Sequence, residues 1–203
     1  MKMDMLSTLS YTTFNDFYIS IKKIRYGWMS FNVVADNKDI SYDASYLCDP
    51  LNDLLDVAVL FAGGPKGKAA SYYPKLNYIG NYFYVTHELE GDSVIWLFKY
   101  VGEELTLIIW NGFPVDMDAL YDLAVADFDD QSLPFTEQDL TQKLVFAMKG
   151  SLLTFAKTLI DTFHNLECLQ RWEDDDDEWG FAYSKNQLDF FLKWVYKNSA
   201  LIN

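Results

Sequence analysis

The stretch that decides the fold reads NYFYVTHELEGDSVIWLFKYVGEELTLIIWNG and covers residues 81–112. It is rich in aromatic and β-branched residues, which favour strands, and Gly91 and Gly102 stand where tight turns are expected. We therefore predict a meander of three antiparallel strands. The predicted strands are residues 82–89, 94–101 and 105–111.

The register of this meander decides which side chains share a face, because side chains alternate along a strand. We pair Leu89 with Ser93 and Val101 with Glu104. One face then carries Tyr82, Tyr84, Val94, Trp96, Phe98, Tyr100, Leu105, Leu107 and Ile109. The opposite face carries Phe83, Val85, Leu89, Ile95, Leu97, Val101, Ile108 and Trp110. Both sets are too apolar to face water, so other elements are expected to cover both faces.

A second meander is predicted in the first quarter of the chain. Residues 17–25, 28–35 and 40–46 read as strands, and the turn formers of residues 36–39 separate the last two. The two meanders give about six strands. The pattern leaves open whether they form one curved sheet or two.

About four helices are expected to pack on these strands. Pro50 suits the first turn of a helix over residues 51–62, and Asp49 is expected to cap it. The longest helix is predicted from residue 137 to about residue 163, with a kink at Gly150. The other two are residues 116–128 and a final helix after Ser184, where Gln187 completes a capping box. The fold class is therefore α+β, with a mostly antiparallel sheet.

Size and composition indicate a globular protein. The chain has 203 residues, of which 50% are hydrophobic, enough to bury a core as a single domain over residues 1–203. Its apolar runs are shorter than the roughly 20 residues that a membrane helix needs, and no signal peptide is evident. We expect a cytoplasmic protein that does not bind membranes. Cys48 and Cys168 lack metal or redox motifs and are expected to be reduced, structural thiols.

The net charge of −14 is unevenly distributed. Residues 100–203 hold 7 Lys and Arg against 19 Asp and Glu, so that 7 − 19 = −12 of the charge lies there. Binding to nucleic acid is disfavoured, because phosphate recognition needs a basic footprint. A basic protein is the expected partner.

The most acidic segment is a run of six acids between two tryptophans, WEDDDDEW. Three interpretations stay open: a solvated connection without a partner, a docking surface for a basic protein, and a divalent cation site. The spacing lacks the alternation of an EF-hand loop, so no metal site is predicted. The candidate partner-binding residues are Trp172, Glu173, Asp174, Asp175, Asp176, Asp177, Glu178 and Trp179, together with Asp116, Asp118 and Asp122.

No catalytic signature was found. His87 and His164 stand at positions typical of structural histidines, and no nucleophile, nucleotide-binding or metalloprotease motif occurs. Four carboxylates lie close in sequence: Asp43, Asp49, Asp53 and Asp56. We interpret Asp49 as a helix cap and the other three as helix surface. We expect no enzyme activity, no catalytic residue and no cofactor. A carboxylate site assembled from distant segments stays an open alternative.

One resemblance bears on function. The runs GWMSF, residues 27–31, and DASYLCDPLNDLL, residues 43–55, followed by a sheet and acidic helices, resemble small uncharacterised bacterial proteins, some of which are similar to immunity proteins of polymorphic toxin systems. The resemblance implies a cytoplasmic protein that neutralises a cognate toxin domain by binding it. It fixes no residue roles.

The sequence thus favours a non-enzymatic protein-binding role, in its sharpest form an immunity protein with an acidic surface. The alternatives are a structural or regulatory interaction module with another partner, and a hydrolase with an unrecognised carboxylate site.

Overall fold

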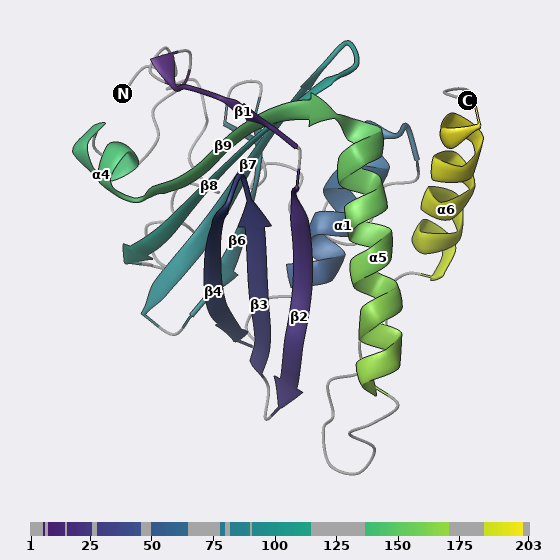
Figure 1. Cartoon of the computed structure of the whole chain (residues 1–203), viewed down its shortest axis with the longest axis horizontal. Helices are drawn as coiled ribbons and strands as arrows, with labels where there is room; N and C mark the ends of the chain where they lie inside the picture. Colours follow the sequence, from purple (N-terminus) through teal and green to yellow (C-terminus); the bar gives the residue numbers. More distant parts are fainter. Residues whose placement is uncertain are drawn as a thin grey trace.

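Two β-sheets and a layer of helices make up the described part of the chain (Figure 1). The structure, a computed structural model, describes residues 6, 8–14, 16–25, 28–45, 50–64, 78–79, 82–89, 91–114, 137–170 and 185–200. The strands are β1 (Thr12–Thr13), β2 (Tyr18–Arg25), β3 (Trp28–Ala35), β4 (Lys38–Ser45), β5 (Tyr78–Ile79), β6 (Tyr82–Glu88), β7 (Asp92–Val101), β8 (Glu104–Pro114) and β9 (Leu144–Ser151). The helices are α1 (Pro50–Phe61), α4 (Glu137–Gln142), α5 (Leu152–Gln170) and α6 (Lys185–Ser199).

The α+β class and the two antiparallel meanders are confirmed, but the strands divide into two sheets. The large sheet has six strands in the order β1-β9-β8-β7-β6-β5, and the small sheet has three in the order β2-β3-β4. The prediction of about six strands was too low, because it missed β9 and the two-residue strands β1 and β5. β1 pairs with β9 in parallel, and the other described pairs are antiparallel.

The predicted helix over residues 137–163 is wrong in its first half. The short helix α4 ends at Gln142, β9 then pairs with β8, and α5 begins only at Leu152. In β9, Phe146 and Met148 face the core two residues apart, so this segment fits a strand period as well as a helix period. The edge of β8 decides between them, because its backbone groups need partners. The predicted helix over residues 116–128 lies outside the described residues.

Gly150 marks the end of a strand rather than a helix kink. A side chain at this position would overlap the ring of Phe14, which packs directly against the Gly150 backbone. The next residue, Ser151, caps α5, because its Oγ accepts a hydrogen bond of 3.1 Å from the backbone N–H of Thr154. Gly150 and Ser151, which were predicted to kink a helix, therefore join β9 to α5.

The predicted register of β6 is wrong by one residue. Glu88, and not Leu89, pairs with Ser93, whereas the predicted pair of Val101 and Glu104 is confirmed. The connection between β6 and β7 is therefore longer than predicted, and a hydrogen bond of 2.9 Å from the backbone N–H of Leu89 to the carbonyl oxygen of Asp92 closes it. Because side chains alternate, the shift exchanges the faces of β6. This exchange turns His87 of β6 toward the main core.

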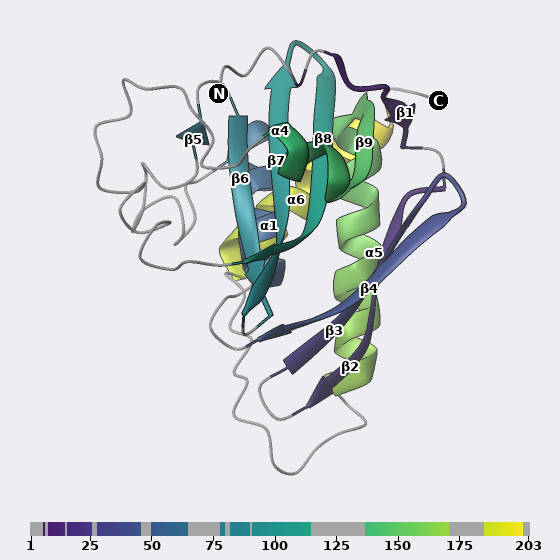
Figure 2. The same ribbon diagram turned by 90° about the vertical axis from the view of Figure 1, so that its left-hand side faces the viewer.

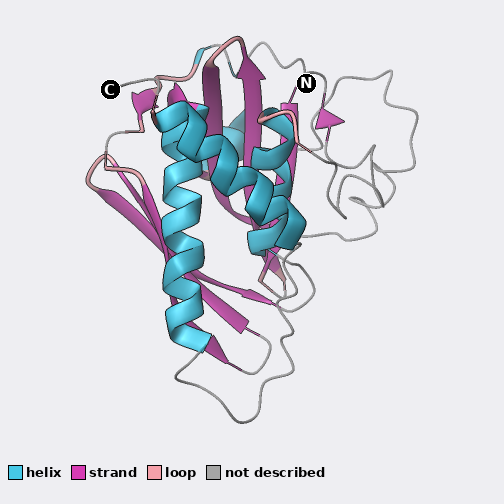
Figure 3. Ribbon diagram, turned by 90° about the vertical axis from the view of Figure 1, so that its right-hand side faces the viewer, coloured by secondary structure: helices cyan, strands magenta, loops and turns pink. Residues whose placement is uncertain are grey.

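Helices α1, α5 and α6 cover one face of the large sheet, and the main core lies between these helices and the sheet (Figure 3). α1 packs on β6, α6 packs on α1 and α5, and α5 runs beside the small sheet. The inner face of the small sheet contributes to the same core, so the two sheets share one apolar interior (Figure 2). The opposite face of the large sheet is also buried, where its side chains form a smaller cluster with Leu6 from the N-terminal segment. The buried members of this cluster are Leu6, Tyr84, Ile95, Leu97, Ile108, Trp110 and Ala147. Burial there raises the pKa of Tyr84 to about 12.

Helix α5 also closes the open edge of the small sheet. Thr158 Oγ1 donates to the carbonyl of Phe17 at 3.2 Å. Thr162 Oγ1 lies 2.9 Å from the carbonyl of Ile19 and 2.8 Å from that of Thr158, so the two acceptors share its proton. Four residues of a helix advance about 6.0 Å and two residues of a strand about 6.7 Å, so the two hydroxyls match alternate carbonyls of β2. A covered edge cannot pair with another chain.

We predict that Thr162→Val destabilises the fold by about 1–2 kcal/mol, because it leaves the buried Ile19 carbonyl without its donor while the side-chain shape is kept. Urea unfolding measures this free energy. The matched control is Thr154→Val, on the exposed side of α5, where the hydroxyl bonds only the exposed Ser151 hydroxyl at 2.9 Å and the capping N–H of Thr154 is kept, so we expect a change within about 0.5 kcal/mol. Equal losses for the two variants would contradict the edge-covering role.

Candidate functional site

The residues predicted to bind a partner all lie outside the described residues. They are residues 172–179 and the acids Asp116, Asp118 and Asp122. In the sequence, residues 172–179 lie between α5, which ends at Gln170, and α6, which begins at Lys185, whereas the three aspartates follow β8, which ends at Pro114. The acidic interface therefore stays a prediction, and the described site lies elsewhere.

That site is a buried network of three polar side chains where the two sheets meet. Trp96 Nε1 in β7 donates a hydrogen bond of 3.2 Å to the hydroxyl of Tyr42 in β4. The same hydroxyl lies 2.7 Å from Nδ1 of His87 in β6. Since the tyrosine oxygen accepts from Trp96, its own proton is available to Nδ1. The network therefore links the small sheet to two neighbouring strands of the large sheet.

Aromatic rings enclose this network. Phe31 stacks on Tyr42 with ring centroids 5.3 Å apart and an interplanar angle of 4°, and its centroid lies 5.4 Å from that of His87. The rings of His87 and Trp96 are 5.6 Å apart. His87 and Trp96 are 0% exposed and Tyr42 is 7% exposed. Side chains from β3, β4, β6 and β7 thus exclude water from the imidazole.

Burial sets the charge state of His87. It lowers the pKa of the imidazole to about 3, a shift that the backbone carbonyl of Pro50 opposes only in part. Nε2 has no hydrogen-bond partner with good geometry in the described part of the chain. The ring is therefore neutral at physiological pH, and it is closed to substrates. The structural role predicted for His87 agrees with this environment, although its link to Tyr42 depends on the register that sequence reasoning missed.

A second buried polar pair joins α1 to α6. Asp56, 7% exposed, accepts a hydrogen bond from Nε2 of Gln187, 4% exposed. The interpretation of Asp56 as helix surface was therefore wrong. The side chain of Gln187 points into the helix interface, and Ser184, the other member of the predicted capping box, lies outside the described residues. Asp43 is exposed as predicted, and Asp49 lies outside the described residues.

The remaining candidate groups do not gather into a site. His164 is exposed on α5. Within the described ranges, no group of three or more His, Cys, Asp or Glu residues could hold a metal ion. Among the helices of those ranges, none has the length and apolarity to span a membrane.

Comparisons with known proteins give little further information. No protein-family model and no curated protein matches the chain. Among solved structures, a chain of the CdiA-CT/CdiI toxin and immunity complex from Enterobacter cloacae aligns over 75% of this chain and 99% of its own length. The identity is 10% and the TM-score is 0.35, a likeness too low to assign a fold or a function.

We predict that His87 makes the fold sensitive to acid. Its pKa is lowered in the folded state, so below its unfolded value of about 6.5 the unfolded chain binds the extra proton and stability falls as the pH falls. Between about pH 8 and about pH 5 this effect costs about 2 kcal/mol. Urea unfolding at both pH values measures it.

The contribution of His87 is isolated by comparing two variants. His87→Asn cannot titrate but keeps an acceptor for the Tyr42 hydroxyl, so its stability should lose about 2 kcal/mol less over this pH range than that of the wild type. His164→Asn changes the exposed histidine and should keep the wild-type dependence. If all three proteins lose stability equally on acidification, His87 is not buried in the neutral form.

Proposed function

We propose that this protein is a non-enzymatic inhibitor that binds and neutralises a basic bacterial toxin domain in the cytoplasm. The observation that carries the proposal is the charge distribution, with −12 of the net −14 on residues 100–203. Such an excess of carboxylates is suited to a positively charged macromolecule and repels anionic partners. The resemblance of residues 27–31 and 43–55 to immunity-like proteins agrees with this role.

The mechanism that we propose has two steps. The negative potential first steers a basic domain toward the acidic half and raises the association rate. Short-range contacts then hold the complex, and Trp172 and Trp179 are the candidate anchors beside the acidic run Glu173–Glu178 because buried aromatic residues contribute strongly to interfaces. Docking would block the active site or substrate groove of the toxin, so the inhibitor needs no catalytic group of its own.

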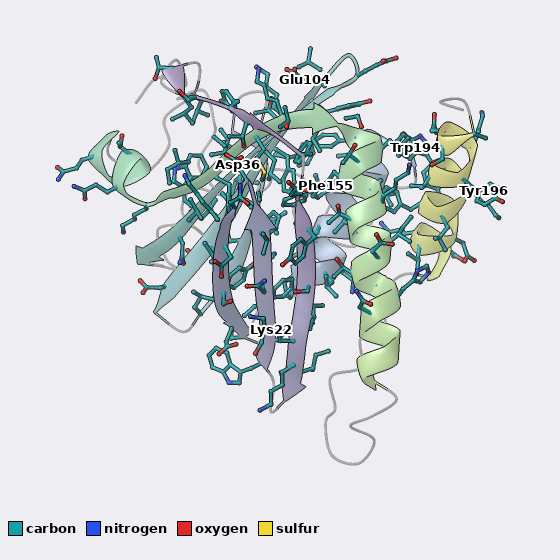
Figure 4. All side chains as sticks on the ribbon, viewed as in Figure 1. Lys22, Asp36, Glu104, Phe155, Trp194 and Tyr196 are labelled. Carbon is teal, nitrogen blue, oxygen red and sulfur yellow. The ribbon has the colours of Figure 1, made fainter. Side chains whose placement is uncertain are left out.

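The described interior is consistent with a rigid binding scaffold. The buried groups His87, Tyr42 and Asp56 are titratable, but each is hydrogen-bonded to another side chain of the interior and almost closed to solvent. Carboxylates are instead exposed on several described elements, including Glu103 in the turn between β7 and β8. Glu104, the first residue of β8, is likewise exposed (Figure 4). Glu104 contacts Lys149 at 3.1 Å, a half-exposed pair that contributes little to stability.

We predict that replacing the four aspartates 174–177 by asparagine slows association with the basic partner by about tenfold, while folding is unchanged, because the loss of four negative charges weakens steering. The partner is the basic protein retained by the immobilised chain from source-cell extract, and surface plasmon resonance measures the association rate. The difference should shrink at about 0.5 M salt, where charges are screened.

The matched control removes the same charge elsewhere. Asp16, Asp36, Asp39 and Asp43 are exposed and lie in the first quarter of the chain. Replacing these four by asparagine gives the same net charge, and Asn tolerates the positive φ of Asp16 and Asp36. The control should retain most of the association rate. An equal decrease in both variants would show that net charge alone acts, and no decrease in either would remove the acidic run from the interface.

A further inference from the structure

Strand β4 is the open edge of the small sheet. The sheet has the order β2-β3-β4, and α5 bonds the opposite edge, at β2. β4 lies at the left of the small sheet in Figure 1, and this edge faces the viewer in Figure 2, where no described helix or strand lies in front of it. The edge strands of the large sheet, β1 and β5, have two residues each, whereas β4 has eight. β4 is therefore the longest strand edge that the described structure leaves uncovered.

The hairpin between β3 and β4 determines which backbone groups point to this edge. Its two-residue turn has positive φ at Asp36, 51°, and at Asn37, 59°, as a type I′ turn requires. The turn hydrogen bond joins the two residues that flank the turn, and bonded and non-bonded pairs then alternate along the two strands. Even-numbered residues of β4 therefore bond β3, whereas the N–H and C=O groups of Asp39, Ser41 and Asp43 point away from it.

These outward backbone groups are unpaired. Asp39, Ser41 and Asp43 are all exposed, and in the described part of the chain their outward N–H and C=O groups have no hydrogen-bond partner. From Asp39 to Asp43 the strand extends about 13 Å. Alternating donors and acceptors along such a line are the template on which an additional strand pairs.

The side chains of the same three residues give this edge a charge pattern. All three point to the outer face of the small sheet, because they alternate with the inward Ile40 and Tyr42. Lys22 Nζ of β2 donates to Ser41 Oγ at 3.3 Å, so its ammonium group lies between the two carboxylates. An added strand therefore meets an acid, an ammonium group and a second acid in turn. The matching order in that strand is a cation, a small uncharged residue and a second cation.

We propose that β4 accepts an antiparallel strand from another protein, an extended segment with Lys or Arg at two positions four residues apart, a small uncharged residue midway and apolar residues between them. The two cations face Asp39 and Asp43, because opposite charges stabilise a cross-strand pair. The apolar residues lie on the inner side, beside the partly buried Ile40. Backbone hydrogen bonds hold the segment, and the charge pattern selects it.

A second copy of this chain is a poorer occupant of the edge. Each copy carries a net charge of −14, so two copies repel each other. In the pairing centred on Ser41, each Asp39 would also stand opposite an Asp43, and like charges directly opposite are destabilising. The inference does not rest on the toxin proposal, because β4 uses no residue of the acidic run, so either can fail without the other.

The probe is the peptide acetyl-Lys-Val-Ser-Val-Lys-amide, added to the full isotope-labelled chain at about 0.05 M salt. In the proposed register its lysines stand opposite the two aspartates and its serine opposite Ser41. We expect saturable changes in the amide NMR spectrum, largest for Asp39, Ser41 and Asp43, whose N–H groups gain acceptors. Absence of binding would overturn the proposal. Changes confined to residues 172–179 would also overturn it, because the peptide would then bind the acidic run.

Two isomeric peptides separate backbone pairing from charge. N-methylation of the serine removes an N–H that points toward β4, whereas N-methylation of the first valine removes one that points away. The serine-methylated peptide should bind at least about fivefold more weakly than the parent, and the valine-methylated peptide within about twofold of it. Equal affinities of the two isomers would overturn the proposal, because their charge is the same.

The edge carboxylates are tested by Asp39→Asn with Asp43→Asn, which keeps the backbone groups and should weaken binding of the parent peptide about fivefold. The matched control is Asp161→Asn with Asp189→Asn, which removes two exposed carboxylates from α5 and α6 and should bind as the wild type does. Circular dichroism verifies that both variants fold. An equal weakening in both would overturn the assigned site, as would a dimeric chain whose three edge amides are protected from exchange without peptide.

Discussion

The fold depends on the hydrogen bond between Tyr42 and His87, because it lies inside the core that the two sheets share. A buried polar group without a partner costs about 1–3 kcal/mol, so the tyrosine hydroxyl and the imidazole must face each other. A shift of β4 or β6 by one residue would turn one of them to the opposite face of its sheet. The bond therefore selects one register for both strands, which apolar packing alone would specify less sharply.

Helix α5 holds the same junction from the other side. It continues directly from β9 of the large sheet, yet its threonines 158 and 162 bond the edge of β2 in the small sheet. One element thus belongs to both sheets, while Tyr42 connects them through side chains. The two connections lie on the outer strands of the small sheet, β2 and β4, so that its orientation over the core is fixed at both edges.

The sequence predicted most elements correctly where the spacing of apolar residues fits only a helix or only a strand. It failed where the spacing fits both. Both meanders and α1 were predicted because alternation and turn residues agree there. Residues 144–151 fit a helix and a strand, and only the unpaired edge of β8, a tertiary feature, decides for the strand. The β6 register depended on the length of one turn, which local propensity does not determine. Asp56 likewise looks like a surface residue until α6 brings Gln187 against it.

Charge illustrates the same limit for function. Composition predicts the acidic half of the chain, but the position of Lys22 and Lys23 on one face of the small sheet arises from a bulge that only strand pairing reveals. In physiological salt, charges more than about 8 Å apart on the surface are largely screened. A ligand therefore responds to the few groups within that distance, and the net charge of −14 governs long-range approach more than local docking. Because of this separation of length scales, exposed lysines and carboxylates on one sheet face offset each other only where they lie within about one Debye length.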